Sequence, residues 1–176
     1  MHRLTLKQKN WLLSAHVAFA ALWTGTVFSI FLVALQNRNT PNGDELYALN
    51  SVISLLDVFI VLPSAIGSAI TATLLCWFTN YGFFKFYWVM VKWILTTLLM
   101  IFGTFWLYPW SEAATSISDT QRLQAWSNPL YLFDTKGVLI GAAIQALCLL
   151  VIIGISVLKP WGRRRIETAG KPAASS

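Results

Sequence analysis

The chain has 176 residues, of which 56% are hydrophobic and only 11% charged, with a formal net charge of +6. Its mean hydropathy is +0.60. A soluble protein of this length has a high ratio of surface to volume and could not bury so much apolar area. The composition excludes a soluble enzyme, a disordered chain and a small disulfide-linked secreted domain, and it predicts an integral membrane protein.

Four apolar runs are long enough to cross a bilayer, because a transmembrane helix needs about 20 mostly apolar residues. They cover residues 11–35, 52–78, 86–107 and 138–158. The apolar residues are continuous rather than alternating, which argues against a membrane β-barrel. We therefore expect an all-α integral membrane four-helix bundle over residues 1–162. A basic cytoplasmic tail over residues 163–176 is expected to be disordered.

The positions of the basic residues predict how the helices are oriented, because cytoplasmic segments carry an excess of Lys and Arg. Ten of the 13 basic residues lie on the side that holds both termini and the connection between the second and third spans. Both termini are therefore predicted to be cytoplasmic. On this interpretation the positive charge reflects the orientation of the helices in the membrane. It does not indicate binding to a nucleic acid, so the bilayer is the expected partner.

The first run has a second interpretation, since Arg3, Lys7 and Lys9 precede it as in a signal peptide. Residues 18–20 also form a weak Ala-x-Ala cleavage pattern. The apolar part of a signal peptide spans only about 7–15 residues, however, whereas this run continues through Val33. We expect an uncleaved first helix.

Turn residues and prolines predict where the first two helices end or bend. Residues 40–43 (Thr-Pro-Asn-Gly) combine a fixed φ with a flexible glycine and predict a turn after the first span. A second turn is expected around residues 80–82. Pro63 lies within the second span, where it removes a backbone donor and clashes with the carbonyl four residues earlier. A kink is therefore expected between Phe59 and Pro63.

A long external loop is expected between the third and fourth spans, over residues 111–136. Within it, Ser118 or Asp119 would cap a short helix, and Pro129 would end that helix. Leu123 and Trp126 would then rest on the membrane surface.

Small residues predict where helices pack closely, because packing rather than hydrophobicity drives helix association in a bilayer. Gly137 and Gly141 have GxxxG spacing in the fourth span, and Gly67 lies among small residues of the second. Two interpretations are open: packing within the bundle, and a homodimer formed through one of these faces.

Three ionisable residues lie at membrane depth, where each costs about 2.5–3.5 kcal/mol by insertion scales and so needs a partner or a role. They are His16, Asp57 and Lys92. Lys92 can extend its stem to the inner interface. Asp57 could pair with Arg38 or Arg122 near the external face, stay protonated and neutral, or serve proton or cation transfer.

His16 is the one candidate cofactor ligand, because a neutral imidazole can bind the iron of haem b. The only other histidine is His2, so a second axial ligand would have to be Met90, Met100, Lys92 or His16 of a second copy. The alternative is a hydrogen bond from His16 to a neighbouring Ser, Thr or backbone carbonyl.

Motifs for soluble chemistry are missing, since the chain has no P-loop, dinucleotide-binding fingerprint, GxSxG or HExxH. Cys76 and Cys148 each lie in an apolar run without CxxC spacing, which is typical of buried free thiols. No metal site and no enzymatic activity are expected.

Three stretches resemble a family of small bacterial integral membrane proteins of unknown function, which is more distantly similar to the copper-resistance D group. Residues 15–25 resemble its "LH…WLG" first helix. Residues 60–72 with 81–96 resemble its "IVP…TG…WGLFR.YWVL.K..LT" block, which includes Lys92. Residues 156–162 (SVLKPWG) resemble "SVYKPRG" at the end of its last helix.

This resemblance implies four helices in a bacterial cytoplasmic membrane and no established activity. Many members carry further histidines late in the third helix and early in the fourth, near the positions of Trp106 and Gly141 here. That departure weakens a histidine-based metal or haem site. The expected function is that of an uncharacterised multi-pass membrane protein; the alternatives are a haem-binding or redox protein using His16, and a small transporter or accessory subunit.

Overall fold

The computed structural model describes residues 4–78 and 85–160, and every regular element within these ranges is helical. Six α-helices are interrupted or joined by two π-helical turns (η1, η2) and one 3₁₀ helix (η3). In chain order they are α1 (Leu6–Asn37), α2 (Gly43–Leu56), η1 (Asp57–Val61), α3 (Leu62–Phe78), α4 (Tyr87–Phe102), η2 (Gly103–Leu107), α5 (Tyr108–Gln121), η3 (Arg122–Ser127) and α6 (Pro129–Leu158).

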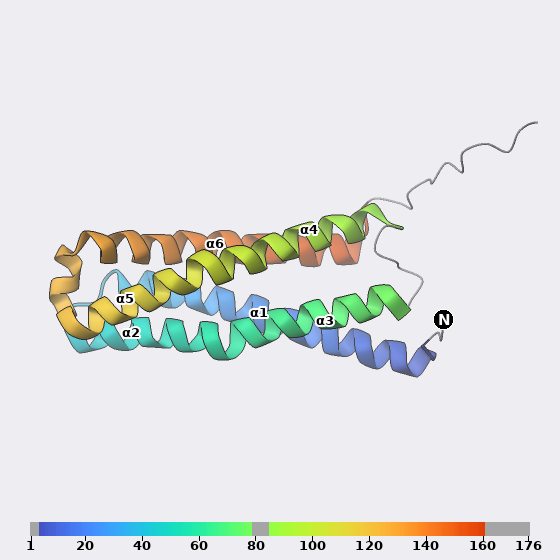
Figure 1. The fold of residues 1–176 in the computed structure, drawn as a ribbon, viewed down its shortest axis with the longest axis horizontal. Helices are drawn as coiled ribbons and strands as arrows, with labels where there is room; N and C mark the ends of the chain where they lie inside the picture. Colours follow the sequence, from blue (N-terminus) through green and yellow to red (C-terminus); the bar gives the residue numbers. More distant parts are fainter. Residues whose placement is uncertain (1–3, 79–84, 161–176) are drawn as a thin grey trace, which may run out of the picture.

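The elements form four long rods, because α2 continues through η1 into α3, and α4 continues through η2 into α5 (Figure 1). Each rod is long and apolar enough to cross a membrane. The rod over Gly43–Phe78 has 36 residues, or about 54 Å at the helical rise of 1.5 Å per residue. This exceeds the ~30 Å of bilayer hydrocarbon, so part of each long rod extends beyond it.

Local sequence explains where the helices begin. The Thr5 side chain and Gln8 form a capping box at the start of α1. The Asn42 side chain accepts a hydrogen bond from the Asp44 backbone N–H at the start of α2. The turn expected at residues 40–43 is confirmed, and Asn128 caps α6 in the same way, with Pro129 in its first turn.

Four helical segments pack into a closed bundle at the end of the molecule that holds the turn after α1. The C-terminal half of α1, α2, α5 and the N-terminal half of α6 contact one another in a ring. We call this region the closed half. A small core of Leu46, Ala114, Ala125 and Tyr131 fills its end.

The other end of the molecule is arranged as a row rather than a ring. There α1 packs against both α3 and α6, and α4 packs against α6, whereas α3 and α4 diverge from the level of the π turns onward (Figure 1). We call this region, made of α3, α4, the N-terminal half of α1 and the C-terminal half of α6, the open half. The beginning of α1 and the end of α6 lie at this same end of the molecule.

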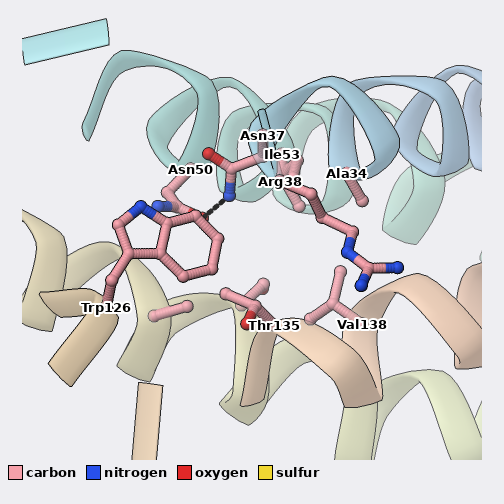
Figure 2. A pocket seen from close by; sticks show the side chains of 10 residues that line it. Ala34, Asn37, Arg38, Asn50, Ile53, Trp126, Thr135 and Val138 are labelled. Carbon is pink, nitrogen blue, oxygen red and sulfur yellow. Dashed lines mark hydrogen bonds between the residues drawn. The ribbon is translucent and has the colours of Figure 1, made fainter. Parts of the chain in front are cut away.

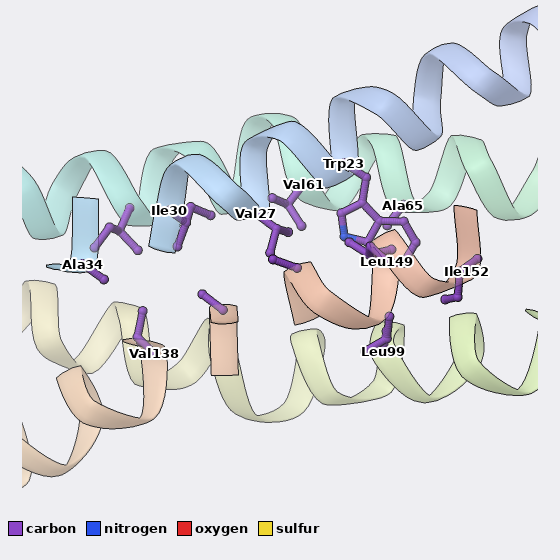
Figure 3. Packing of buried hydrophobic residues seen from close by; sticks show 13 residues of the cluster. Trp23, Val27, Ile30, Ala34, Val61, Ala65, Leu99, Val138, Leu149 and Ile152 are labelled. Carbon is purple, nitrogen blue, oxygen red and sulfur yellow. The ribbon is translucent and has the colours of Figure 1, made fainter. Parts of the chain in front are cut away.

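The main hydrophobic core connects the two halves along α1 and α6. Trp23, Val27 and Ile30 of α1 belong to one continuous core with Val138, Leu149 and Ile152 of α6 (Figure 3). Trp23 is the largest fully buried side chain, with 2% of its surface exposed. The outward faces carry many large apolar residues, as expected for helices that face lipid.

The expected external loop over residues 111–136 is wrong. Helix α5 continues to Gln121, and α6 begins at Pro129, so Pro129 starts a helix instead of ending one. Ser118 caps nothing and lies fully buried inside α5. The Trp126 ring packs edge-on against Tyr131 at 5.3 Å between centroids, while Leu123 is exposed. Their position on the membrane surface stays a prediction.

The glycines of the expected close-packing faces are covered within the chain. A Cβ on Gly67 would come within 2.7 Å of the Phe19 ring, and one on Gly137 within 2.7 Å of the Trp110 ring. A Cβ on Gly141 would come closer still to the Leu107 side chain. These faces serve packing within the bundle, while the homodimer stays a prediction.

Several expectations lie outside the described residues. These are the turn around residues 80–82, His2, and the basic tail over residues 163–176.

Candidate functional site

Two π-helical turns lie at the junction of the closed and open halves, and both precede a proline. Leu62 N–H donates to the Asp57 carbonyl, and Tyr108 N–H donates to the Gly103 carbonyl, each across one residue more than in an α-helix. Pro63 lies six residues after Asp57, the first residue of its π turn, and Pro109 lies six residues after Gly103, the first residue of the other. Widening the turn accommodates a ring that would otherwise clash with the carbonyl four residues earlier.

The kink expected between Phe59 and Pro63 is therefore present as a wider turn over Asp57–Val61. The second π turn was not expected from the sequence. The sequence feature that could have indicated it is the position of Pro109 six residues after Gly103, which repeats the position of Pro63 six residues after Asp57. Single π turns are found disproportionately at functional sites, so two of them at the same height along the bundle indicate a candidate functional region.

A cavity of about 300 Å³ lies between the two π turns; we call it the central cavity. Its apolar wall is formed by Val58, Val61, Leu62, Ala65, Leu99 and Met100. Its polar or amphipathic lining residues are Trp23, Asp57, Thr104, Tyr108 and Gln145, and Gly103 completes it. A mostly apolar wall with few polar groups is the usual construction of a small-molecule site.

The central cavity reaches the lipid-facing surface. Leu62 and Tyr108, which line it, are 45% and 40% exposed, and Thr104 is exposed as well. Leu62 begins α3 and Thr104 lies in the π turn that follows α4, the two helices that diverge from this level onward (Figure 1). A molecule dissolved in the bilayer can therefore approach the cavity from the side.

Two smaller cavities continue from the central cavity toward the closed end. One of about 20 Å³ shares Asp57 and Gln145 with the central cavity. Another of about 10 Å³ shares Ile53, Ser111 and Val138 with the first. Each has room for about one water molecule. Asp57 thus lies where the wide cavity meets a narrow series of cavities.

A buried hydrogen-bond network borders the last of these cavities (Figure 2). Asn37 Nδ2 donates to Asn50 Oδ1 at 3.0 Å, and Asn50 Nδ2 donates to the Tyr131 hydroxyl at 3.1 Å. Asn50 Nδ2 also reaches the Leu46 carbonyl at 3.0 Å. This network, which sequence reasoning missed, joins α1, α2 and α6 in the closed half.

Asp57 does not pair with either expected arginine within the described residues. Arg122 instead contacts Asp44 and Asp119, each at 3.4 Å, and its guanidinium lies 4.6 Å from the centre of the Tyr47 ring. Glu112 of α5 is close enough to Asp57 to repel it, and Ser54 donates a hydrogen bond to Glu112. The Asp57 carboxylate itself has no hydrogen bond or ion pair in residues 4–78 and 85–160.

His16 and Lys92 come together, but not with Asp57. His16 Nδ1 lies 3.1 Å from the Ser68 carbonyl and 3.0 Å from Thr71 Oγ1, so it joins α1 to α3. Lys92 of α4 is close enough to interact electrostatically with His16 and Cys76. Asp57 and Ser68 are 11 residues apart, or roughly 16 Å along the helix.

His16 is not among the residues that line the central cavity, whereas Met100 is. The bond at Nδ1 leaves Nε2 as the nitrogen that a haem iron would take. In the described part of the chain, no group of three or more His, Cys, Asp or Glu side chains could hold a metal ion. The haem alternative stays a prediction.

Gln145 of α6 joins the fourth rod to the third, since its Nε2 donates to the Leu99 carbonyl of α4 at 3.5 Å. Trp23 was not expected to matter, yet its indole Nε1 is buried without a partner in the described residues. An unpaired buried donor costs about 1–3 kcal/mol. Both residues place polar groups beside an otherwise apolar cavity.

The family resemblance seen in the sequence stays a prediction. Comparisons of this chain with protein-family models, with curated proteins and with solved structures found no match.

Proposed function

We propose that the protein is a multi-pass membrane protein that binds a small, largely apolar ligand inside the bilayer, in the central cavity. The observation that carries this proposal is the cavity of about 300 Å³ between the two π turns. Its volume lies at the lower end of the range of about 300–1,000 Å³ for ligand pockets. Binding rather than chemistry is proposed, because no nucleophile–base pair lines the cavity.

The bilayer is the expected source of the ligand, since the cavity opens between α3 and α4 among exposed apolar residues. We propose a bacterial cytoplasmic membrane with both ends of the chain on the cytoplasmic side, because most basic residues lie at that end. Cysteines introduced at Lys7 and at Thr120 test the orientation, since only the second should react with an impermeant maleimide in intact cells.

Binding to the cavity can be tested with tert-butylbenzene, an apolar probe that carries no charge. Protein in lipid nanodiscs should show saturable uptake above that of empty nanodiscs. Gly103→Leu should abolish it, because a Cβ on Gly103 lies 3.4 Å from Gln145 Nε2, and the rest of the leucine then occupies the cavity.

Gly154→Leu is the matched control, since no atom lies within 4 Å of a Cβ at that position. This variant should bind the probe like the unmodified protein. Uptake by the unmodified protein that equals uptake by Gly103→Leu would contradict the proposed function.

A transporter is the second candidate, favoured by the series of small cavities that joins Asp57 to the closed half. This route would carry water or protons, since each cavity has room for about one water molecule. Proton flux into proteoliposomes that falls in Asp57→Asn would support it, and flux equal to that of empty liposomes would contradict it.

A further inference from the structure

Asp57 is a carboxylate without a counter-ion at the edge of an apolar cavity. None of the residues described as lining the central cavity is a Lys, Arg or His. The charged residue that interacts with Asp57 is Glu112, which has the same sign. A half-buried carboxylate in such surroundings is costly unless it is protonated or a positive charge pairs with it.

Three basic residues of the surrounding segments lie outside the central cavity. Arg38 lines the cavity of about 10 Å³ toward the closed end instead. Arg122 contacts Asp44 and Asp119 at the end of the closed half. Lys92 lies in the open half close to His16 and Cys76. No described Lys, Arg or His lines the central cavity, so an ionised Asp57 finds no counter-ion of the protein there.

The shape of the cavity restricts what can supply the missing positive charge. Its wall is mostly apolar, and it opens sideways between α3 and α4, where Leu62 is exposed. A hydrated metal ion would lose its water shell against such a wall without gaining oxygen ligands. An organic cation with a hydrocarbon body satisfies both the wall and the carboxylate.

We propose that the central cavity binds a lipophilic organic cation, of the ammonium class, that enters from the bilayer between α3 and α4 and pairs with Asp57. The hydrocarbon part of this ligand lies against Val61, Leu99 and Met100. This inference rests on the proposed function. It adds that the ligand carries a positive charge and that Asp57 is the residue that recognises this charge.

The test uses two probes of the same shape, phenyltrimethylammonium and tert-butylbenzene, which differ in that the first carries a positive charge. Both are titrated into the full chain in lipid nanodiscs. We expect Asp57→Asn to weaken phenyltrimethylammonium binding by about tenfold or more, because a desolvated ion pair is lost. Binding of tert-butylbenzene should remain, which also shows that the variant is folded.

Two control variants separate the role of Asp57 from a general effect of charge. Asp44→Asn removes the same charge from a side chain that is 87% exposed, and it should leave both affinities unchanged. Asp57→Glu keeps the carboxylate and should retain binding of the cation, even if Asp57→Asn fails to fold.

The outcomes distinguish this inference from the proposed function. Equal affinity of phenyltrimethylammonium for the unmodified protein and Asp57→Asn overturns the cation inference, and so does binding of tert-butylbenzene alone. Failure of both probes to bind the unmodified protein overturns the proposed function itself. Loss of cation binding in Asp57→Asn, with retention in Asp57→Glu, supports both.

Discussion

The closed and open halves of the bundle are formed by the same four rods but differ in how their polar side chains are hydrogen-bonded. In the closed half, Asn37, Asn50 and Tyr131 bond to one another across three helices. In the open half, His16 joins only α1 and α3, and α4 stands apart from α3. The difference shows that a network fixed by mutual hydrogen bonds closes the bundle, whereas separated helices leave room for a ligand.

The two π turns mark the boundary between these regions. Each lies just before a proline, and the central cavity lies between them. Asp57 begins the π turn at the end of the closed half, and α3 and α4 diverge from this level onward. Breaking each half separately should therefore have different consequences.

The largest expected effect comes from breaking the network of the closed half. Asn50→Leu removes the closer partner of the Tyr131 hydroxyl and of the Asn37 amide, which are both buried and keep only their mutual contact at 3.4 Å. We expect the free energy of unfolding to fall by about 3 kcal/mol, because two buried polar groups lose partners. Unfolding in detergent micelles, followed by circular dichroism, measures it.

Asn39→Leu is the control for this variant, because Asn39 lies exposed in the turn after α1. It should change stability by less than about 0.5 kcal/mol. If Asn50→Leu proves as stable as this control, the closed half is held by apolar packing alone.

A second comparison uses the same substitution in both halves. Gly137→Ala brings a methyl group within 2.7 Å of the Trp110 ring, so it should cost about 1–3 kcal/mol of stability through overpacking. Gly154→Ala meets no atom within 4 Å in the open half. It should stabilise α6 by about 0.5–1 kcal/mol, because alanine loses less backbone entropy than glycine. Thermal unfolding of the two variants should shift in opposite directions, and shifts of equal sign would contradict the packing difference.

The membrane class and the number of spans could be predicted from the sequence, because both follow from the length of apolar runs. The ends of the third and fourth rods could not. Residues 111–127 are polar, and polarity indicated a loop, yet the closed half buries Ser111 and Ser118 within α5. Tertiary packing around Tyr131 outweighed the local signal.

Of the residues that form the candidate site, Asp57 is the one that the sequence singled out as a candidate for function. Asp57 stood out because an acid at membrane depth is rare. Nothing comparable in the sequence pointed to Gly103, Thr104 or Tyr108. They line the same cavity as Asp57 only because the second and third rods lie side by side, with their two π turns at the same height along the bundle. Which helices are neighbours is a long-range property that spacing along the chain does not encode.

A third prediction concerns the boundary itself. Replacing both Pro63 and Pro109 by alanine allows the π turns to become α-helical, which should draw α3 and α4 together. Spin labels at Ile70 and Leu98, both exposed on these helices, should then show a shorter separation. Uptake of tert-butylbenzene should fall together with the separation, while the stability changes by only about 1 kcal/mol, since the π turns already accommodate the rings. An unchanged separation would show that the prolines do not cause the divergence.

The smallest expected effect lies at the end of the closed half, where Arg122 adopts a φ of 50°. This conformation strains a residue with a side chain, by about 1–3 kcal/mol, but not glycine. The two ion pairs of Arg122 are partly exposed and contribute little, about 0–1 kcal/mol at low salt.

Arg122→Ala loses the ion pairs and keeps the strain, so it should be slightly less stable than the unmodified protein. Arg122→Gly loses the same ion pairs but relieves the strain, so it should be more stable than Arg122→Ala by about 1 kcal/mol. Urea unfolding at low and high salt separates the contributions, because salt weakens only the ion pairs; equal stability of the two variants would show that the backbone at Arg122 is not strained.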